Sequence, residues 1–230
     1  MIQTIPITHT IIPYTYKGST FSTEQFRGAF IDFALNNLTE EEKNMYPVHW
    51  IHNKDENGKP LTRYSRIQYQ TNKKEIGITA IGELDKLINI IIDKIRKNPD
   101  TFTVNKKEIH LGLPYQYTEH WLPVTAKPQV YEMEKWIPFR SENLGDESRF
   151  PQIIWGNIHR FLSDMNIKFD KKPFIHILDY KRNKKRFKAY NVKWFSYKII
   201  FSTDINLPQN IGLGHIISLG AGKIKKKKLL

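Results

Sequence analysis

The sequence predicts an α+β protein with two tandem ferredoxin-like (RRM-like) domains of the order β-α-β-β-α-β, the second degenerate, and a C-terminal glycine-rich loop. Three observations predict this fold class. Strand and helix periodicities alternate in that order over residues 1–113. A shorter round of the same kind follows over residues 129–230, and a stretch with three prolines, residues 114–128, separates the two. We therefore expect two domains, 1–113 and 129–230, joined by a linker, 114–128.

In the first domain, residues 4–13 alternate like a β-strand, and Ser22 or Thr23 can cap the helix that follows. That helix has apolar residues at helical spacing, namely Phe26, Phe30, Phe33, Ala34 and Leu38. Gly28 inside it costs about 1 kcal/mol relative to alanine, which predicts a close packing contact at this position. Strands are expected at residues 64–70 and 75–81.

The next helix has the clearest periodicity in the chain, with a stripe formed by Leu84, Leu87, Ile88, Ile91 and Ile95. Residues 101–113 supply a further strand pair or bend, which completes the first β-α-β-β-α-β set. In the second domain we expect strands at residues 130–139, 174–180, 187–201 and 222–226. Pro151 suits the first turn of a helix between the first two of these strands. No second helix is visible, so this repeat is degenerate.

Composition limits the partners of the chain. With 36 Lys and Arg against 23 Asp and Glu, the 230 residues carry a formal charge of +13. Such a field attracts polyanions, with nucleic acid first and an anionic membrane surface second, although a basic protein need not bind either. The absence of cysteine excludes disulfides, thiolate zinc sites and cysteine nucleophiles. Without a signal peptide or an apolar stretch of membrane-spanning length, we expect a cytoplasmic protein and no membrane partner.

Four glycines close to the C-terminus, Gly212, Gly214, Gly220 and Gly222, have the spacing G-x-G-x-x-x-x-x-G-x-G. Glycine lets the backbone approach a ligand closely, and successive N–H groups in such a turn can bind an anion. His215 lies inside this loop, and a lysine run that includes Lys223 and Lys225 follows it. A flexible hairpin is the alternative interpretation. The loop lacks both the nucleotide P-loop and the dinucleotide-binding spacing.

A second basic run spans residues 181–188 and reads as a hairpin with one aromatic residue. Its candidate phosphate-binding side chains are Lys181, Arg182, Lys184, Lys185 and Arg186. Any single run of this kind can be a solvated hairpin tip. Two runs in the same half of the chain, one beside the glycine-rich loop, favour a phosphate-binding face.

Three motifs together resemble a known family. They are the glycine-rich loop, Lys17-Gly18-Ser19 before the helix segment Phe26-Arg27-Gly28-Ala29-Phe30, and a segment from His52-Asn53 through Gly58-Lys59 to an R-Y-x-x-I-Q-Y strand at residues 63–69. This combination resembles the CRISPR-associated endoribonucleases of the RAMP superfamily, which cut precursor CRISPR RNA within its repeats. The resemblance implies two ferredoxin-like domains, a glycine-rich loop that contacts RNA, and Arg27 among the RNA-binding residues.

Internal cleavage of RNA needs no metal, because the 2′-hydroxyl can attack the adjacent phosphate. Histidine can move both protons, and a lysine can stabilise the charge on phosphorus. Of eight histidines, His49 and His52 lie in the loop after the first helix, where side chains can face a substrate. The resemblance makes His52 the favoured general base or acid, His49 the runner-up and Lys59 the phosphate stabiliser. The two histidines could suit a metal pair, but no further ligands complete a cluster, so neither metal nor cofactor is expected.

The leading hypothesis is therefore a metal-independent endoribonuclease that cleaves precursor CRISPR RNA (crRNA) within its repeats, leaving 5′-hydroxyl and 2′,3′-cyclic phosphate ends. The alternative is a non-catalytic RAMP subunit that binds guide RNA in an interference complex. A ribosomal type of basic RNA-binding protein is a third option. Expected partners are CRISPR repeat RNA, and beyond it the subunits of a CRISPR effector complex or a second copy of the chain.

Overall fold

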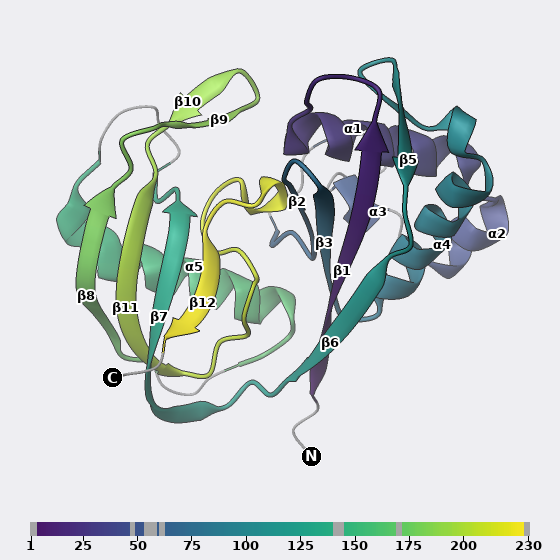
Figure 1. Cartoon of the computed structure of the whole chain (residues 1–230). Helices are drawn as coiled ribbons and strands as arrows, with labels where there is room; N and C mark the ends of the chain where they lie inside the picture. The colour runs from purple at the N-terminus through teal and green to yellow at the C-terminus, as the bar shows by residue number, and fades with distance from the viewer. Residues whose placement is uncertain are drawn as a thin grey trace. The chain divides into compact units, whose positions relative to one another are not determined.

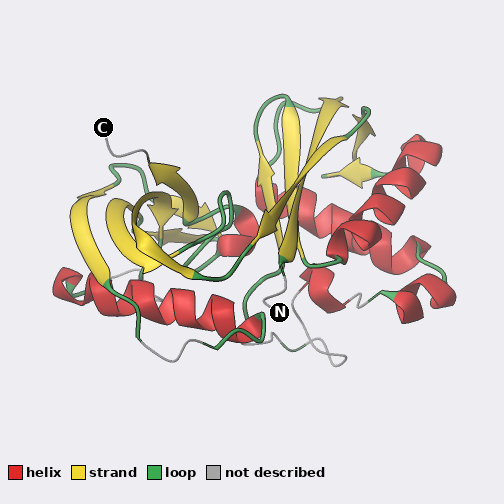
Figure 2. Ribbon diagram, turned by 90° about the horizontal axis from the view of Figure 1, so that it is seen from below, coloured by secondary structure: helices red, strands yellow, loops and turns green. Residues whose placement is uncertain are grey.

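The computed structural model describes residues 4–46, 49–52, 59, 63–139, 145–168 and 172–227. The chain divides into two compact units, one over residues 6–120 and one from residue 121 onward, which also includes the residues before Pro6. Each unit has an antiparallel sheet with its helices on one face (Figures 1 and 2). The predicted α+β class with two tandem ferredoxin-like units is confirmed.

The N-terminal unit is a ferredoxin-like sheet with additions. Its main elements are β1 (Ile5–Tyr16), α1 (Thr23–Asn37), β2 (Ile67–Thr71), β3 (Glu75–Ile81), α4 (Leu84–Lys97) and β5 (Lys107–Leu111). The shorter elements are α2 (Glu40–Met45), α3 (His49–His52), η1 (Pro99–Thr101) and β4 (Thr103–Val104). The strand order β2-β3-β1-β5-β4 gives the ferredoxin-like arrangement, with β4 added at one edge. Both α2 and α3 lie in the connection from α1 to β2, where the sequence predicts the catalytic loop.

Helix α1 begins where the sequence predicts. The Ser22 hydroxyl accepts a hydrogen bond from the Gln25 N–H at 3.2 Å, and the Gln25 side chain accepts one from the Ser22 N–H at 2.8 Å, which is a capping box. Phe26 and Phe30 are fully buried against the sheet. The expectation for Gly28 was wrong, because a Cβ at this position would have no neighbour within 4 Å.

Most of the stretch expected to be a linker is strand. Residues 115–121 form β6 (Tyr115–Trp121), which pairs with β1, and the Thr8 and Thr118 hydroxyls lie 3.0 Å apart. The prolines at both ends of this stretch obscured a strand that continues the edge begun by β5. Trp121 already belongs to the second unit, where its ring lies 5.0 Å from that of Phe161.

The C-terminal unit repeats the same strand order with one helix fewer. Its elements are β7 (Thr125–Trp136), η2 (Glu147–Arg149), α5 (Phe150–Asp164), β8 (Ile175–Arg182), β9 (Phe187–Ala189), β10 (Val192–Trp194), β11 (Tyr197–Ile205), η3 (Ile217–Leu219) and β12 (Lys223–Lys227). The sheet order is β12-β7-β11-β8, and α5 runs behind it (Figure 1). Between β11 and β12 the described chain has only the short η3 and the glycine-rich loop, so the degenerate repeat is confirmed.

The basic hairpin differs from its expected position. The single strand expected over residues 187–201 is three strands, because Tyr190 and Asn191 adopt positive φ angles of 51° and 62° and turn the chain from β9 into β10. The hairpin is therefore β9–β10. The basic run 181–188 forms the end of β8 and the segment that leads into this hairpin.

Candidate active site and basic surface

The two candidate catalytic histidines stand on one helical turn. Helix α3 has only four residues, and His49 and His52 are three apart, so their side chains leave the same side of the turn. Between them, Ile51 is 2% exposed and anchors the turn in the hydrophobic core of the N-terminal unit. On this turn His49 is exposed and His52 is half-buried.

Two arginines from outside α3 hold its backbone. The Arg27 guanidinium, on α1, donates a hydrogen bond to the main-chain carbonyl of His52 at 3.1 Å. The Arg63 guanidinium donates in the same way to the carbonyl of His49, also at 3.1 Å. These contacts satisfy carbonyls that a short helix leaves without intrahelical partners. They tie the histidine-bearing turn to α1 and to the segment that precedes β2.

The ring of Trp50, also on α3, contacts two arginines. The guanidinium carbon of Arg63 lies 3.6 Å from the centre of the Trp50 ring, and that of Arg66 lies 4.3 Å from it. Cation–π contacts of this kind contribute roughly 0.5–2 kcal/mol each. Both arginines belong to the R-Y-x-x-I-Q-Y segment, but residue spacing predicts no role for either, because their contact with Trp50 is tertiary.

The surroundings of His49 lower the pKa of its imidazole. Partial loss of solvent and then the positive charge of Arg63 lower the pKa of His49 below its ordinary value. A neutral imidazole at neutral pH can accept a proton. Nearby, burial raises the pKa of the Tyr69 hydroxyl, and the positive charge of Arg27 offsets part of that rise.

Lys59 and Arg27 are the other candidate site residues of the N-terminal unit. Lys59 is exposed, but its neighbours at 53–58 and 60–62, which carry the His-Asn pair and the Gly-Lys turn, lie outside the described residues. Arg27 is half-buried, and its described hydrogen bond goes to the histidine turn. That contact favours a positioning role for Arg27 over the RNA contact predicted from the sequence.

The glycine-rich loop is bound tightly to its own sheet. The N–H of Gly222 donates to the Lys135 carbonyl at 3.2 Å, and the N–H of His215 donates to the Ile137 carbonyl at 3.2 Å. The Leu213 N–H donates to the Gly222 carbonyl at 2.9 Å. These three N–H groups therefore donate to main-chain carbonyls of the protein itself.

Close packing explains why two positions in this loop are glycine. Gly222 has φ of +65°, and a Cβ there would lie 1.9 Å from the Leu213 carbonyl oxygen. Gly214 has φ of +107°, and its Cβ would lie 2.9 Å from two atoms of the buried Trp136 ring. The other two loop glycines are Gly212, which is buried, and Gly220, which has φ of +81° and ends η3. The loop is thus a fixed structure whose partly exposed residues include His215.

A basic surface pocket of about 510 Å³ lies in the C-terminal unit, at one end of β7 and β11. We call it the β7–β11 pocket. Its lining residues are Glu134, Lys135, Asn183, Lys184, Lys185, Arg186, Phe187, Lys188, Ser196 and Lys198. Three of the five predicted basic side chains, Lys184, Lys185 and Arg186, line it. Lys135, Lys188 and Lys198 join them, and only the fold brings these groups together.

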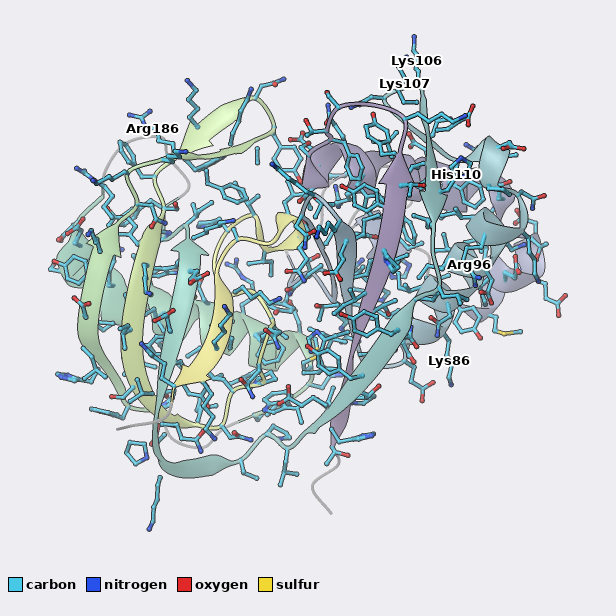
Figure 3. The ribbon with its side chains drawn as sticks, viewed as in Figure 1. Lys86, Arg96, Lys106, Lys107, His110 and Arg186 are labelled. Atoms are coloured by element: carbon cyan, nitrogen blue, oxygen red, sulfur yellow. The ribbon has the colours of Figure 1, made fainter. Side chains whose placement is uncertain are left out.

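The two basic runs meet at the end of β7. In the sheet, Lys223 of β12 pairs with Glu134, and the Gly222 N–H binds the next carbonyl, that of Lys135. Burial, and then the charge of Lys225, lower the pKa of the Lys223 amine, while Glu134 acts in the opposite direction. Figure 3 shows Arg186 where the chain passes from β8 towards β9. One end of this sheet therefore carries both the glycine-rich loop and the β7–β11 pocket.

Part of the lysine charge is neutralised within the sheet. Glu132 of β7 forms ion pairs with Lys198 at 3.1 Å and with Lys227 at 3.0 Å. Burial alone would raise the pKa of this carboxyl, but the hydrogen bonds from the two lysines lower it overall. Among the described residues, no group of three or more His, Asp or Glu side chains is arranged to hold a metal ion. None of the described helices is long and apolar enough to cross a membrane.

The family model described as the Cas6b C-terminal domain matches residues 112–227, about half of the chain. This chain belongs to the Cas6b C-terminal domain family. The match covers the unit with the glycine-rich loop and the β7–β11 pocket, and it confirms the resemblance found in the sequence motifs. No curated protein sequence matches the chain.

Solved Cas6 structures share the fold over the whole length. A crystal structure of Cas6b is 19% identical, with a TM-score of 0.67, and the match covers 97% of this chain and 99% of the other. A crystal structure of the CRISPR RNA processing endoribonuclease Cas6b is 16% identical, with a TM-score of 0.58 and coverages of 96% and 100%. A Cas6 product complex is 8% identical, with a TM-score of 0.65 and coverages of 99% and 100%. The Cas6 fold thus includes the N-terminal unit, which the family model does not reach.

Proposed function

We propose that this member of the Cas6b family is a metal-independent endoribonuclease that cleaves precursor CRISPR RNA within its repeats. The observation that carries the proposal is the pair of histidines on α3, a turn whose backbone is held by Arg27 and Arg63. Cleavage of RNA by its own 2′-hydroxyl needs two proton transfers, and two imidazoles on one side of a fixed turn suit them. One of the Cas6b structures that share the fold is named a CRISPR RNA processing endoribonuclease, which supports the same reaction class.

In the proposed reaction, one imidazole removes the proton of the 2′-hydroxyl, and the 2′-oxygen attacks the adjacent phosphorus. The bond from phosphorus to the 5′-oxygen breaks, and a protonated imidazole supplies the proton that this oxygen takes. The products are a 2′,3′-cyclic phosphate and a 5′-hydroxyl. We assign these transfers to His52 and His49, and the stabilisation of the phosphorus-centred charge to Lys59. Because the substrate supplies the nucleophile, the reaction needs no metal ion.

The C-terminal unit would then hold the RNA. Its proposed contacts are the basic side chains Lys181, Arg182, Lys184, Lys185 and Arg186, with Lys223 and Lys225 and the partly exposed residues of the glycine-rich loop, His215 among them. Phosphate contacts of this kind give binding that weakens as salt increases. Catalysis in the N-terminal unit and RNA binding in the C-terminal unit would thus be separable by mutation.

The test is incubation of the purified protein with a 5′-labelled CRISPR repeat RNA in EDTA, alongside the His52→Ala and His49→Ala variants. The proposal expects one discrete cut by the wild type, with cyclic phosphate and 5′-hydroxyl ends. It also expects that His52→Ala abolishes the cut while the dissociation constant for the RNA changes little. His176→Ala, which removes a histidine of β8 in the other unit, is the matched control. Tight binding without any cut by the wild type would instead identify a guide-binding subunit.

A further inference from the structure

Strand β7 is irregular at the two residues that line the β7–β11 pocket. Along a regular strand, neighbouring side chains point to opposite faces of the sheet. Glu134 and Lys135 are neighbours, yet both line the pocket. The register explains how this is possible. Tyr197 pairs with Trp136, but Ile199 pairs with Met133, so Lys198 alone stands opposite both residues. This is a β-bulge, which redirects a side chain.

The bulge places a lysine in an uncommon backbone conformation. Lys135 has φ of 51°, a region in which residues other than glycine are infrequent. Its carbonyl is held there by the Gly222 N–H. Its side chain is exposed, so packing in the core does not account for a lysine at this position. This backbone conformation adds the Lys135 amine to the cations of the pocket. Backbone strain of this kind is typical of functional sites.

The other walls of the pocket are also held in position. The Asn183 N–H and side-chain amide donate to the Ser196 carbonyl at 2.8 Å and to its hydroxyl at 3.0 Å. The Arg186 guanidinium carbon lies 4.2 Å from the centre of the Phe195 ring. Six lysine and arginine side chains line the pocket against one carboxylate, that of Glu134. A volume of about 510 Å³ is within the range of sites for small organic ligands.

Phe187 makes the pocket suitable for an anion that carries a planar ring. Its half-buried ring is the aromatic residue among the lining side chains, beside the cations. Cations beside an aromatic ring fit a phosphate joined to a planar base, and a base can stack on a side chain only when it is not stacked in a duplex. We propose that the β7–β11 pocket binds one unpaired nucleotide of an RNA strand, with the phosphate on Lys135 and Arg186 and the base on Phe187. This inference rests on the proposed function for the RNA, and it adds a site for single-stranded RNA in the C-terminal unit.

The decisive variant is Lys135→Gly. Glycine adopts the positive φ freely, so the variant should melt at the same temperature as the wild type or higher, while it loses one cation. We expect roughly three- to tenfold weaker binding of a fluorescein-labelled single-stranded repeat RNA, with the salt slope reduced by about 0.7 for one phosphate. The matched control is Lys106→Gly, because Lys106 also has a positive φ, 60°, and lies at the tip between β4 and β5 (Figure 3). Equal affinities of Lys135→Gly and Lys106→Gly would overturn the proposal.

Two further arms test the nucleotide. Phe187→Leu keeps the apolar character and should weaken binding of single-stranded RNA, while Phe187→Tyr should restore it. The same substitutions should leave binding of a fully paired RNA duplex unchanged. An equal loss for single strand and duplex would contradict stacking on an unpaired base. Displacement of the RNA probe by micromolar adenosine monophosphate would show that the pocket takes free nucleotides instead, which also overturns the proposal.

The binding test of the pocket and the cleavage test of the proposed function can fail independently. All binding measurements use RNA with a 2′-deoxy nucleotide at the cut position, so they do not depend on cleavage. If the wild type cuts the repeat and Lys135→Gly binds normally, the pocket assignment is wrong and the endoribonuclease stands. If the wild type cuts nothing and Lys135→Gly still weakens single-strand binding, the endoribonuclease is wrong and the pocket stands.

Discussion

The guanidinium of Arg27 donates a hydrogen bond to the main-chain carbonyl of His52 at 3.1 Å. Arg27 lies on α1, and His52 ends the short helix α3, so a residue from a helix that packs in the core of the N-terminal unit holds the end of the histidine turn. The contact is made to the main chain of His52 and not to its imidazole. Arg27 therefore helps to fix where the His52 backbone lies.

We expect Arg27→Met to slow cleavage more than it weakens binding. Loss of the hydrogen bond lets the His52 backbone move, and a displacement near 1 Å can reduce a rate by about a hundredfold. Single-turnover cleavage of repeat RNA measures the rate, and fluorescence anisotropy measures the dissociation constant. A loss of affinity as large as the loss of rate would instead make Arg27 an RNA-binding residue.

The pH dependence of cleavage should identify the role of His49. The charge of Arg63 contributes to the lowered pKa of His49, so its removal should raise that pKa. If the neutral His49 imidazole is the base, the rate falls as pH decreases through this pKa. In Arg63→Gln that fall should then begin at a higher pH than in the wild type. Arg63→Lys keeps the charge and should keep the profile, even if the rate drops. Identical profiles in all three proteins would remove His49 from the reaction.

The same lowered pKa predicts the effect of His49 on folding. The unfolded chain binds a proton on this imidazole more readily than the folded chain does, so its contribution to stability is complete above the unfolded pKa, about 6.5. That contribution is lost as pH decreases through the folded pKa. Urea unfolding at pH 7.5 and pH 5 should therefore show a smaller decrease in the free energy of unfolding for His49→Gln than for the wild type. An equal decrease in the two proteins would contradict the lowered pKa.

Two glycine-to-alanine substitutions should have opposite effects on stability. In Gly222→Ala the new Cβ meets the Leu213 carbonyl oxygen at 1.9 Å and the backbone keeps φ of +65°, so we expect a loss of more than about 2 kcal/mol. In Gly28→Ala the Cβ meets nothing within 4 Å inside α1, so we expect a gain of about 0.5–1 kcal/mol. Chemical denaturation of both variants measures the two values. A Gly222→Ala protein as stable as the wild type would show that the loop can rearrange.

Acid should destabilise the C-terminal sheet partly through Glu132. Its pKa is lowered in the folded protein, so the ion pairs with Lys198 and Lys227 contribute fully above the unfolded pKa and are lost as pH falls through the folded one. Both lysines are close to half exposed, which limits the contribution to about 0.5–1 kcal/mol. Between pH 6 and pH 3 the free energy of unfolding should fall by about that much less in Glu132→Gln than in the wild type. Parallel pH curves for the two proteins would argue against these ion pairs.

The sequence predicted much of the fold because its signals are local. The capping box at Ser22, the apolar stripe of α4 and the alternation along β1 each depend on residues a few positions apart, which periodicity detects. The histidine turn and the glycine-rich loop were also recognisable as motifs. Local signals failed at β6, where Pro114 and Pro123 suggested a linker, and at Gly28, where an unfavourable residue suggested packing that does not exist.

The amino-acid sequence by itself determined the order of the main strands and helices in the two ferredoxin-like units, the basic charge and the family, because motif spacing and composition are properties of the chain. Only the tertiary structure decided which groups act together. Arg27 reaches His52 across 25 positions, the Arg63 guanidinium lies over the Trp50 ring, and a bulge in β7 lets Lys135 line the same pocket as Arg186. The physical reason is that hydrogen bonds, cation–π contacts and pockets depend on distances in space, which the sheet register sets and residue spacing does not encode.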